Sequence, residues 1–291
     1  MARRNNKAYG TCRLTGKAGK YVKSHLIPEA LTRLSDTGEP YVEARIGRGK
    51  IRRFTSWYDS ALVTRDGEDI LARIDSCAIE ELRRQRLVWS SWGSVDRLQS
   101  DDLVVEGDQP TFRVVRFTQP RVIQLFFMSL LWRAAATTRS EFDLVTLAAE
   151  DLEDLMRRVV HENVGSPEDY PVHLFQIFTR GPSHNRTPLL ERRRFEPMEG
   201  VLDDPLEMPY VRFFLDGLVA HVYLARRVPL TAAFLSTCVG FSEATVVFAH
   251  EYERSRTAAN IREMVVTVER ALRNPPSPMR PVALAIRRTR R

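Results

Sequence analysis

The sequence has 291 residues, of which 43% are hydrophobic and 28% are charged, and its formal net charge is +7. This length suits one large domain or two smaller ones, and the apolar content is ample for a core. The first seven residues lead into no apolar stretch of the secretory type, and the most hydrophobic run, 122–132, is too short to cross a bilayer. Three widely separated cysteines argue against a disulfide scaffold. We therefore expect a cytoplasmic protein that makes no membrane contact.

Positive charge gathers at both ends of the chain. Residues 1–54 hold 13 Lys or Arg against four Asp or Glu, and residues 287–291 add four arginines. A basic head and tail on a mildly acidic body predict contact with a polyanion such as nucleic acid. For the tail, a solvated and disordered basic segment is the simpler explanation. For the head, the functional interpretation is stronger because its basic residues surround a motif.

Four elements are predicted within the first hundred residues. In chain order they are a β segment at 20–23, a helix from Pro28 to 34, a hairpin of 41–46 with 50–54, and a helix at 68–87. Pro28 suits a first helical position, where its missing N–H is not needed. The 68–87 helix has an apolar stripe with helical spacing, formed by Leu71, Ile74, Ala78 and Leu82.

The rest of the chain predicts helices mixed with an antiparallel sheet, which is an α+β arrangement. The expected elements are a strand at 112–117, a buried helix from Pro120 to about 136, an amphipathic helix at 148–162, a strand at 172–179, a hairpin of 210–215 with 218–224, and a helix at 257–273. Asp216-Gly217 gives the strongest hairpin signal. The three arginines at 192–194 are expected in a polar loop, where solvation explains them more simply than a phosphate contact.

The stretch Ser24-His25-Leu26-Ile27-Pro28 is where chemistry is expected. A histidine at the end of a strand can take a proton from a water that attacks a phosphodiester, while a metal ion held by the following loop and helix stabilises the departing oxygen. Glu68 and Asp75 lie two turns apart, so both carboxylates project from nearly the same helix face. Basic residues would hold the phosphate backbone.

These stretches resemble one group of bacterial HNH-related proteins. That group carries Cys-x-x-Cys, then Ser-His-Ile-Ile-Pro, then a second Cys-x-x-Cys followed directly by Glu and, seven residues later, by another acidic residue. The matching stretches here are Cys12-Arg-Leu-Thr15, Ser24 to Pro28, and Thr64-Arg-Asp-Gly67-Glu68 with Asp75 beyond. The run 125–133 resembles the group's Leu-Trp-Arg helix, and Gly165 to Tyr170 falls in a matching place. The resemblance covers about residues 10–180.

The resemblance implies a nuclease of the ββα-metal type that acts on DNA. His25 would be the general base, and Glu68 and Asp75 would bind or orient a Mg²⁺ or Mn²⁺ ion. Phosphates would be held by Lys20, Lys23, Arg45, Arg48, Arg52 and Arg53. The implied organisation is an HNH-like ββα module with a basic arm at 1–95, a linker at 96–110, an α+β domain at 111–280 and a basic tail at 281–291.

The zinc positions of the group are where this chain departs from it. Only Cys12 matches, because Thr15, Thr64 and Gly67 occupy the other three places. A structural zinc ion normally needs four ligands, so we expect none here and expect packing to hold the module instead. Loss of the zinc ligands also leaves open a module that binds nucleic acid or joins a bacterial defence or mobile-element complex without catalysis.

Each candidate residue has an ordinary structural explanation as well. Without the motif, His25 could be a capping or packing histidine. Glu68 could be an acidic residue favoured by the helix dipole in the first turn, and Asp75 could form an ordinary surface ion pair. If the motif is coincidental, the chain is a globular interaction protein. The other histidines show no metal-ligand spacing, and Cys77 and Cys238 are more typical of small core residues than of nucleophiles.

Overall fold

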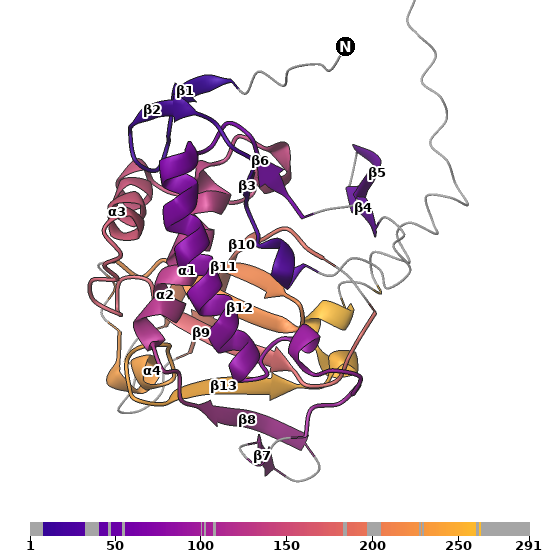
Figure 1. Ribbon diagram of the computed structural model, residues 1–291. Helices are drawn as coiled ribbons and strands as arrows, with labels where there is room; N and C mark the ends of the chain where they lie inside the picture. The colour runs from indigo at the N-terminus through magenta and orange to yellow at the C-terminus, as the bar shows by residue number, and fades with distance from the viewer. Residues whose placement is uncertain are drawn as a thin grey trace, which may run out of the picture.

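The computed structural model describes residues 8–32, 41–45, 48–53, 56–99, 101, 103–106, 109–182, 185–196, 205–226, 228, 230–259 and 262. The strands are β1 (Tyr9–Thr11), β2 (Ala18–Lys20), β3 (Ser24–His25), β4 (Tyr41–Arg45), β5 (Arg48–Arg53), β6 (Tyr58–Asp59), β7 (Leu103–Glu106), β8 (Gln109–Val115), β9 (Val172–Ile177), β10 (Leu189–Phe195), β11 (Leu206–Leu215), β12 (Leu218–Tyr223) and β13 (Thr245–His250). The helices are α1 (Arg65–Arg84), α2 (Pro120–Ala136), α3 (Ala149–Val160) and α4 (Ala232–Ser236), with 3-10 turns η1 (Glu29–Leu31), η2 (Trp89–Ser91), η3 (Ser140–Phe142) and η4 (Tyr252–Arg254). The fold is therefore α+β, as the sequence predicts (Figure 1).

Three two-stranded pairs precede the main sheet. They are the antiparallel pairs β1–β2, β3–β6 and β4–β5, and the last of these is the predicted hairpin. The predicted helix after Pro28 is shorter than expected and forms only the 3-10 turn η1. The Thr32 side chain donates to the Glu29 carbonyl at 2.9 Å, while the Thr32 backbone is extended. This local bond competes with further helical turns.

Helix α1 begins three residues before its predicted start, directly after Thr64. The four residues of its predicted stripe are all buried, with exposed fractions of 3% or less. Figure 1 shows α1 running along α2, and both helices contribute to one continuous hydrophobic cluster. The amphipathic prediction is confirmed because the stripe is a local property of the sequence.

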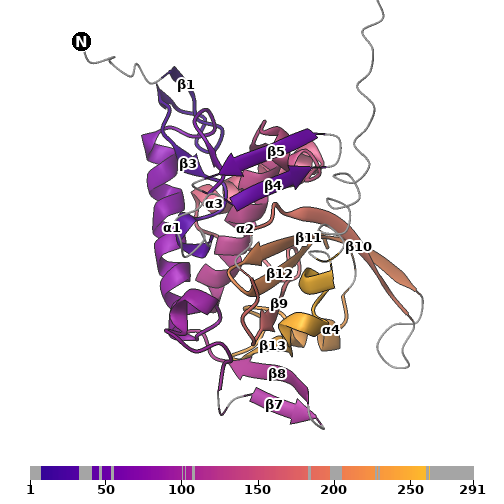
Figure 2. The same ribbon diagram turned by 90° about the vertical axis from the view of Figure 1, so that its right-hand side faces the viewer.

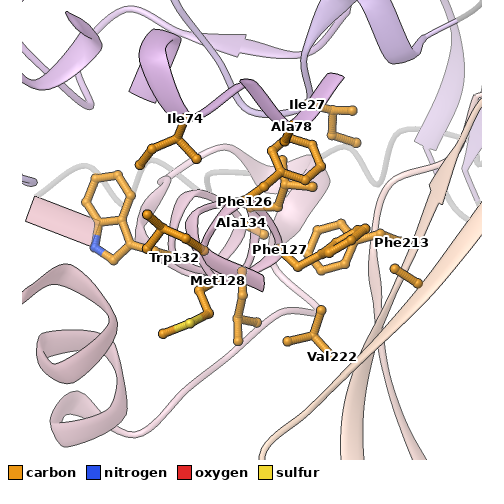
Figure 3. Packing of buried hydrophobic residues seen from close by; sticks show 14 of the residues in the cluster. Ile27, Ile74, Ala78, Phe126, Phe127, Met128, Trp132, Ala134, Phe213 and Val222 are labelled. Atoms are coloured by element: carbon orange, nitrogen blue, oxygen red, sulfur yellow. The ribbon is translucent and has the colours of Figure 1, made fainter. Parts of the chain in front are cut away.

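Helix α2 is the centre of the core. Almost every residue from Ile123 to Ala136 is buried, which is typical of a helix that is covered on all sides. Phe126, Phe127 and Met128 are fully buried, and Figure 3 shows α2 side chains between Ile74 of α1 and Phe213 and Val222 of the main sheet. Among the described helices, none is both long and apolar enough to span a membrane.

The main sheet has seven strands in the order β10-β11-β12-β9-β13-β8-β7. Neighbours are antiparallel except for β13 and β9, which run parallel, so the predicted antiparallel sheet is mixed at this one pair. Figure 2 shows α1 on one side of the sheet and α4 on the other. The predicted 210–215 with 218–224 hairpin is confirmed as β11–β12, with its turn at Asp216 and Gly217.

Two regions differ from what the sequence suggests. The arginines at 192–194 lie in the edge strand β10 and not in a loop. An edge strand tolerates charged residues, and in the sequence such residues resemble those of a polar loop. The Trp89 to Gly93 stretch looks like a linker, yet Trp89 is buried and its indole N–H donates to the Ile177 carbonyl at 2.8 Å. Gly217 approaches this ring so closely that a Cβ there would lie 2.4 Å from it.

The predicted boundaries can be placed against these elements. The predicted linker at 96–110 contains β7 and the start of β8, and the main hydrophobic cluster draws residues from both sides of it. Residues 256–259 begin the helix expected at 257–273. Apart from Arg262, the rest of that helix and the tail at 281–291 lie outside the described residues.

We expect Phe127→Ala to lower the free energy of unfolding by about 3–5 kcal/mol, because it removes a fully buried ring at the centre of the core. Urea denaturation followed by circular dichroism measures the change. Leu144→Ala is the matched control, since Leu144 is 67% exposed, and it should alter the value by less than about 0.5 kcal/mol. Equal effects of the two substitutions would contradict this assignment of the core.

Candidate functional site

His25 ends the short strand β3 and is fixed there by backbone pairing. It lies opposite Tyr58 in the antiparallel β3–β6 register, and the following N–H, of Leu26, donates to the Trp57 carbonyl at 2.8 Å. The His25 and Tyr58 rings meet edge to face with centroids 6.4 Å apart. The His25 side chain remains 25% exposed, so it lies at the surface rather than within the core.

Arg133 of α2 joins the elements of the site. Its side chain is 1% exposed, and it donates to both carboxylate oxygens of Asp75, at 2.5 and 2.9 Å. The same guanidinium donates to the His25 carbonyl at 3.0 Å and to the Ser129 hydroxyl at 2.8 Å. One buried cation therefore ties α2 to α1 and to the strand that carries His25.

The surroundings of His25 keep its ring neutral near pH 7. Burial lowers the pKa of His25, the positive charge of Lys23 lowers it further, and Glu29 opposes both. The Nε2 atom is buried without a hydrogen bond, and the nearest Glu29 oxygen is 3.7 Å away. A neutral imidazole with an unused nitrogen can accept a proton.

Glu68 lies in the first turn of α1, near Ser24 of β3. Burial raises the pKa of Glu68, whereas the side chain of Ser24 and the charge of Arg133 lower it. Glu68 Oε2 and Ser24 Oγ are both buried, and neither has a well-formed hydrogen bond. Ser24 therefore lowers the pKa of the Glu68 carboxylate without forming a well-aligned hydrogen bond to it. Unsatisfied buried polar atoms are uncommon, and two facing each other are a candidate ligand position.

Asp75 takes a different position from the one expected of a metal ligand. Arg133 binds both of its oxygens, so Asp75 belongs to the support of His25 and contacts no open site. Among the described residues, no group of three or more His, Cys, Asp or Glu is close enough to hold a metal ion. The structure therefore brings Glu68 and Asp75 onto one helix but does not gather them into a ready-made metal centre.

Cations lie beside His25, on the ring of Tyr58. Lys23 Nζ is 4.4 Å from the centroid of this ring and the Arg139 guanidinium is 5.9 Å from it. Lys20 is exposed at the end of β2. The remaining predicted phosphate contacts are in the hairpin β4–β5, whose side chains lie outside the described residues: Arg45, Arg48, Arg52 and Arg53.

The four positions that correspond to the zinc cysteines come together in space. Thr15 N–H donates to Cys12 Sγ at 3.4 Å, and a Cβ on Gly67 would lie 2.7 Å from the same sulfur. Burial raises the pKa of the Cys12 thiol, but contacts from Thr15 and from the Thr64 backbone outweigh this and lower it overall. One sulfur, two threonines and a close-packed glycine thus form a corner between the β1–β2 turn and the start of α1.

Comparisons of the chain with family models, with curated proteins and with solved structures found no match. The site therefore has to be interpreted from its own geometry.

Sequence reasoning overlooked three residues that shape the site. Arg133 lies within the Leu-Trp-Arg stretch that carries part of the resemblance, and Ser24 lies within the motif itself, so the sequence pattern could have indicated both. No sequence pattern indicates Arg139, because only folding of the chain brings it to Tyr58. Cys77 is exposed, whereas Cys238 is buried as predicted.

Breaking the Arg133–Asp75 pair should be costly. We expect Arg133→Met to lower the free energy of unfolding by about 3–5 kcal/mol, because a mostly buried carboxylate loses its partner. Adding Asp75→Leu should recover much of that loss, since the pair is then replaced by apolar groups. Denaturant unfolding of the two single variants and the double variant measures the coupling.

The exposed pair of Arg73 and Glu162 is the control for this cycle. Arg73→Ala should change stability by no more than about 1 kcal/mol. A coupling between Arg133 and Asp75 as small as that of the exposed pair would show that the buried cation does not hold the site together.

Replacing the Glu68 carboxylate should stabilise the protein in a pH-dependent way. Because burial raises the pKa of Glu68 in the folded state, the folded chain binds this proton more tightly than the unfolded chain does. The charged carboxylate is therefore a cost that grows as pH rises through the folded pKa. Glu68→Gln should raise the melting temperature at pH 8, and the gain should shrink toward pH 4.

Differential scanning calorimetry across this range tests the prediction, with Glu153→Gln as an exposed control. A difference between wild type and Glu68→Gln that stays constant with pH would contradict the assigned environment of Glu68.

Proposed function

We propose that the protein is a metal-dependent nuclease of the HNH-related ββα type that hydrolyses DNA phosphodiesters, with His25 as the general base. The observation that carries this proposal is a neutral histidine at a strand end whose backbone is held by a buried arginine while its Nε2 atom makes no hydrogen bond. A histidine kept only for packing would not need such support. The antiparallel β3–β6 pair followed by α1 supports the proposal, because a ββα-metal site would need a strand pair followed by a helix.

His25 would take the proton of the attacking water. Its lowered pKa keeps the ring able to accept a proton at neutral pH. Arg133 does not contact the imidazole but fixes the carbonyl of the same residue, so it is a positioning residue. Asp75 acts through Arg133 by holding the guanidinium in place.

Lys23 and Arg139 would hold the phosphate backbone. Both cations lie on the Tyr58 ring, which also contacts the His25 imidazole. A phosphodiester bound between them would place its phosphorus near the base. Because such contacts are electrostatic, the affinity for DNA should fall steeply as the salt concentration rises.

Glu68 fits as a ligand for a Mg²⁺ or Mn²⁺ ion, and Ser24 fits beside it. Both present a buried oxygen without a well-formed hydrogen bond, and these ions prefer oxygen ligands and usually bind one or two carboxylates while keeping several waters. When bound, the ion would supply positive charge for the departing oxygen. Asp75 does not fit as a direct ligand because Arg133 occupies both of its oxygens.

One observation favours a second candidate function, which is DNA binding without catalysis. With Asp75 paired to Arg133, the two carboxylates of α1 expected to bind the metal ion supply one ligand residue instead of two. A module of this kind would bind DNA in a salt-dependent manner, or join a larger complex, and would show no turnover.

The test is cleavage of supercoiled plasmid DNA by the full chain with Mg²⁺ or Mn²⁺. We expect His25→Ala to lower the rate by at least about 100-fold, as is typical for loss of a general base. His161→Ala is the matched control because this histidine is exposed outside the site, and it should cleave like wild type. Circular dichroism confirms that both variants fold.

Undiminished cleavage by His25→Ala would refute the role of His25. Salt-dependent binding without cleavage by the wild-type chain would select the binding module instead. Metal analysis of the purified protein adds an independent check, since stoichiometric zinc would contradict the interpretation of the four cysteine positions.

A further inference from the structure

The two faces of the main sheet carry different chemistry. Phe213 and Val222 point toward α2 and are part of the main core (Figure 3). The residues that alternate with them along β11 and β12 point to the opposite face, because successive side chains of a strand lie on opposite sides of the sheet. That face carries polar and aromatic residues on three neighbouring strands, namely Tyr210, Arg212, His221, His173 and Phe175.

Arg212 lies near the middle of this face with an incomplete set of hydrogen bonds. It is 7% exposed, and its Cα partners are Leu189 of β10 and His221 of β12. Its Nη2 atom donates to Thr257 Oγ1 at 3.0 Å. Its Nη1 atom is buried and has no hydrogen-bond partner. A buried guanidinium nitrogen without a hydrogen-bond acceptor costs free energy. Arg212 Nη1 therefore lacks one acceptor that a ligand could supply.

Two more arginines surround the same place, and among the described residues one carboxylate, that of Glu191, interacts with them. Arg256 donates to Glu191 Oε2 at 2.9 Å, and the Tyr210 hydroxyl donates to this same oxygen at 2.6 Å. Arg186 makes no hydrogen bond or ion pair with any residue in the described part of the chain. Three guanidinium groups against one carboxylate leave an excess of two positive charges.

The three arginines repel one another electrostatically. Burial lowers the pKa of Arg212, and Arg186 and Arg256 lower it further, while Glu191 and Tyr210 oppose them. Burial likewise lowers the pKa of Arg186, and Arg256 adds to this effect. A bound anion would reduce the repulsion between the arginines and would supply the hydrogen-bond acceptor that Arg212 Nη1 lacks.

Aromatic rings continue from the arginine cluster across the sheet. His221, beside Arg212, lies against Phe175 with ring centroids 4.4 Å apart. Phe175 in turn stacks on Phe248 at 5.2 Å and on His250 at 6.0 Å. Phe175 and Phe248 are partly exposed and His250 is exposed. Rings on a sheet face next to arginines are the arrangement by which proteins stack nucleotide bases and hold their phosphates.

We propose that Arg186, Arg212 and Arg256 bind the phosphate of a nucleotide whose base stacks on the adjoining rings of Phe175 and His250. The phosphate could belong to a free mononucleotide or to a residue of a single strand, which share the same recognition chemistry. This site lies on the opposite side of the sheet from α2 and His25 and requires no metal ion. It is therefore independent of the proposed nuclease activity.

The test is binding to the full chain in EDTA, where a metal-dependent nuclease is inactive. The probes are inorganic phosphate and adenosine monophosphate by titration calorimetry, and a labelled 12-nucleotide single strand by fluorescence anisotropy. Arg186→Ala and Arg256→Ala should each weaken binding about tenfold, as expected for loss of a charged hydrogen bond. Arg192→Ala and Arg194→Ala, which remove exposed arginines of β10, should stay within twofold of wild type.

The probes distinguish the two sources of phosphate. Binding of the mononucleotide supports a free nucleotide, and binding of the single strand alone supports a nucleic acid. If the mononucleotide binds, an affinity no greater than that of inorganic phosphate overturns the stacking of a base. The whole proposal is overturned if no probe binds, or if Lys23→Ala abolishes binding while Arg186→Ala and Arg256→Ala leave it intact.

Discussion

The buried pair of Arg133 and Asp75 fixes strand β3 and helices α1 and α2 relative to one another. The charge of an arginine that is 1% exposed is costly to bury, and the carboxylate, the Ser129 hydroxyl and the His25 carbonyl around Arg133 offset this cost. Each partner comes from a different place in the sequence, so the cation fixes their relative positions. The backbone of the partly exposed His25 is thus held by a cation that is itself buried.

Helix α2 connects this site to the rest of the molecule. Its arginine supports the His25 strand, while its phenylalanines pack on the inner face of the seven-stranded sheet. The outer face of the same sheet carries the arginine and aromatic cluster around Arg212. Two polar surfaces are thus built on opposite sides of one apolar helix–sheet layer, and neither requires the other in order to form.

The sequence predicts elements whose signals are local and misses those that depend on distant partners. The stripe from Leu71 to Leu82, the start of α2 at Pro120 and the Asp216-Gly217 turn were all found from short patterns. Strand β10 was missed because its arginines look solvated until β11 pairs with it. Within the site, a motif identified His25 and Glu68. The ion pair of Asp75 with α2 spans 58 residues and leaves no local trace.

The corner formed by Cys12, Thr15, Thr64 and Gly67 has a consequence for the history of the fold. A side chain at Gly67 would meet the Cys12 sulfur at 2.7 Å and Val63 at 3.1 Å, so both neighbours would have to move. On the proposed relationship, a single reversion to cysteine there would crowd the corner and still lack the other ligands. Replacing the zinc ligands at this corner with packed side chains would then be difficult to reverse by single substitutions.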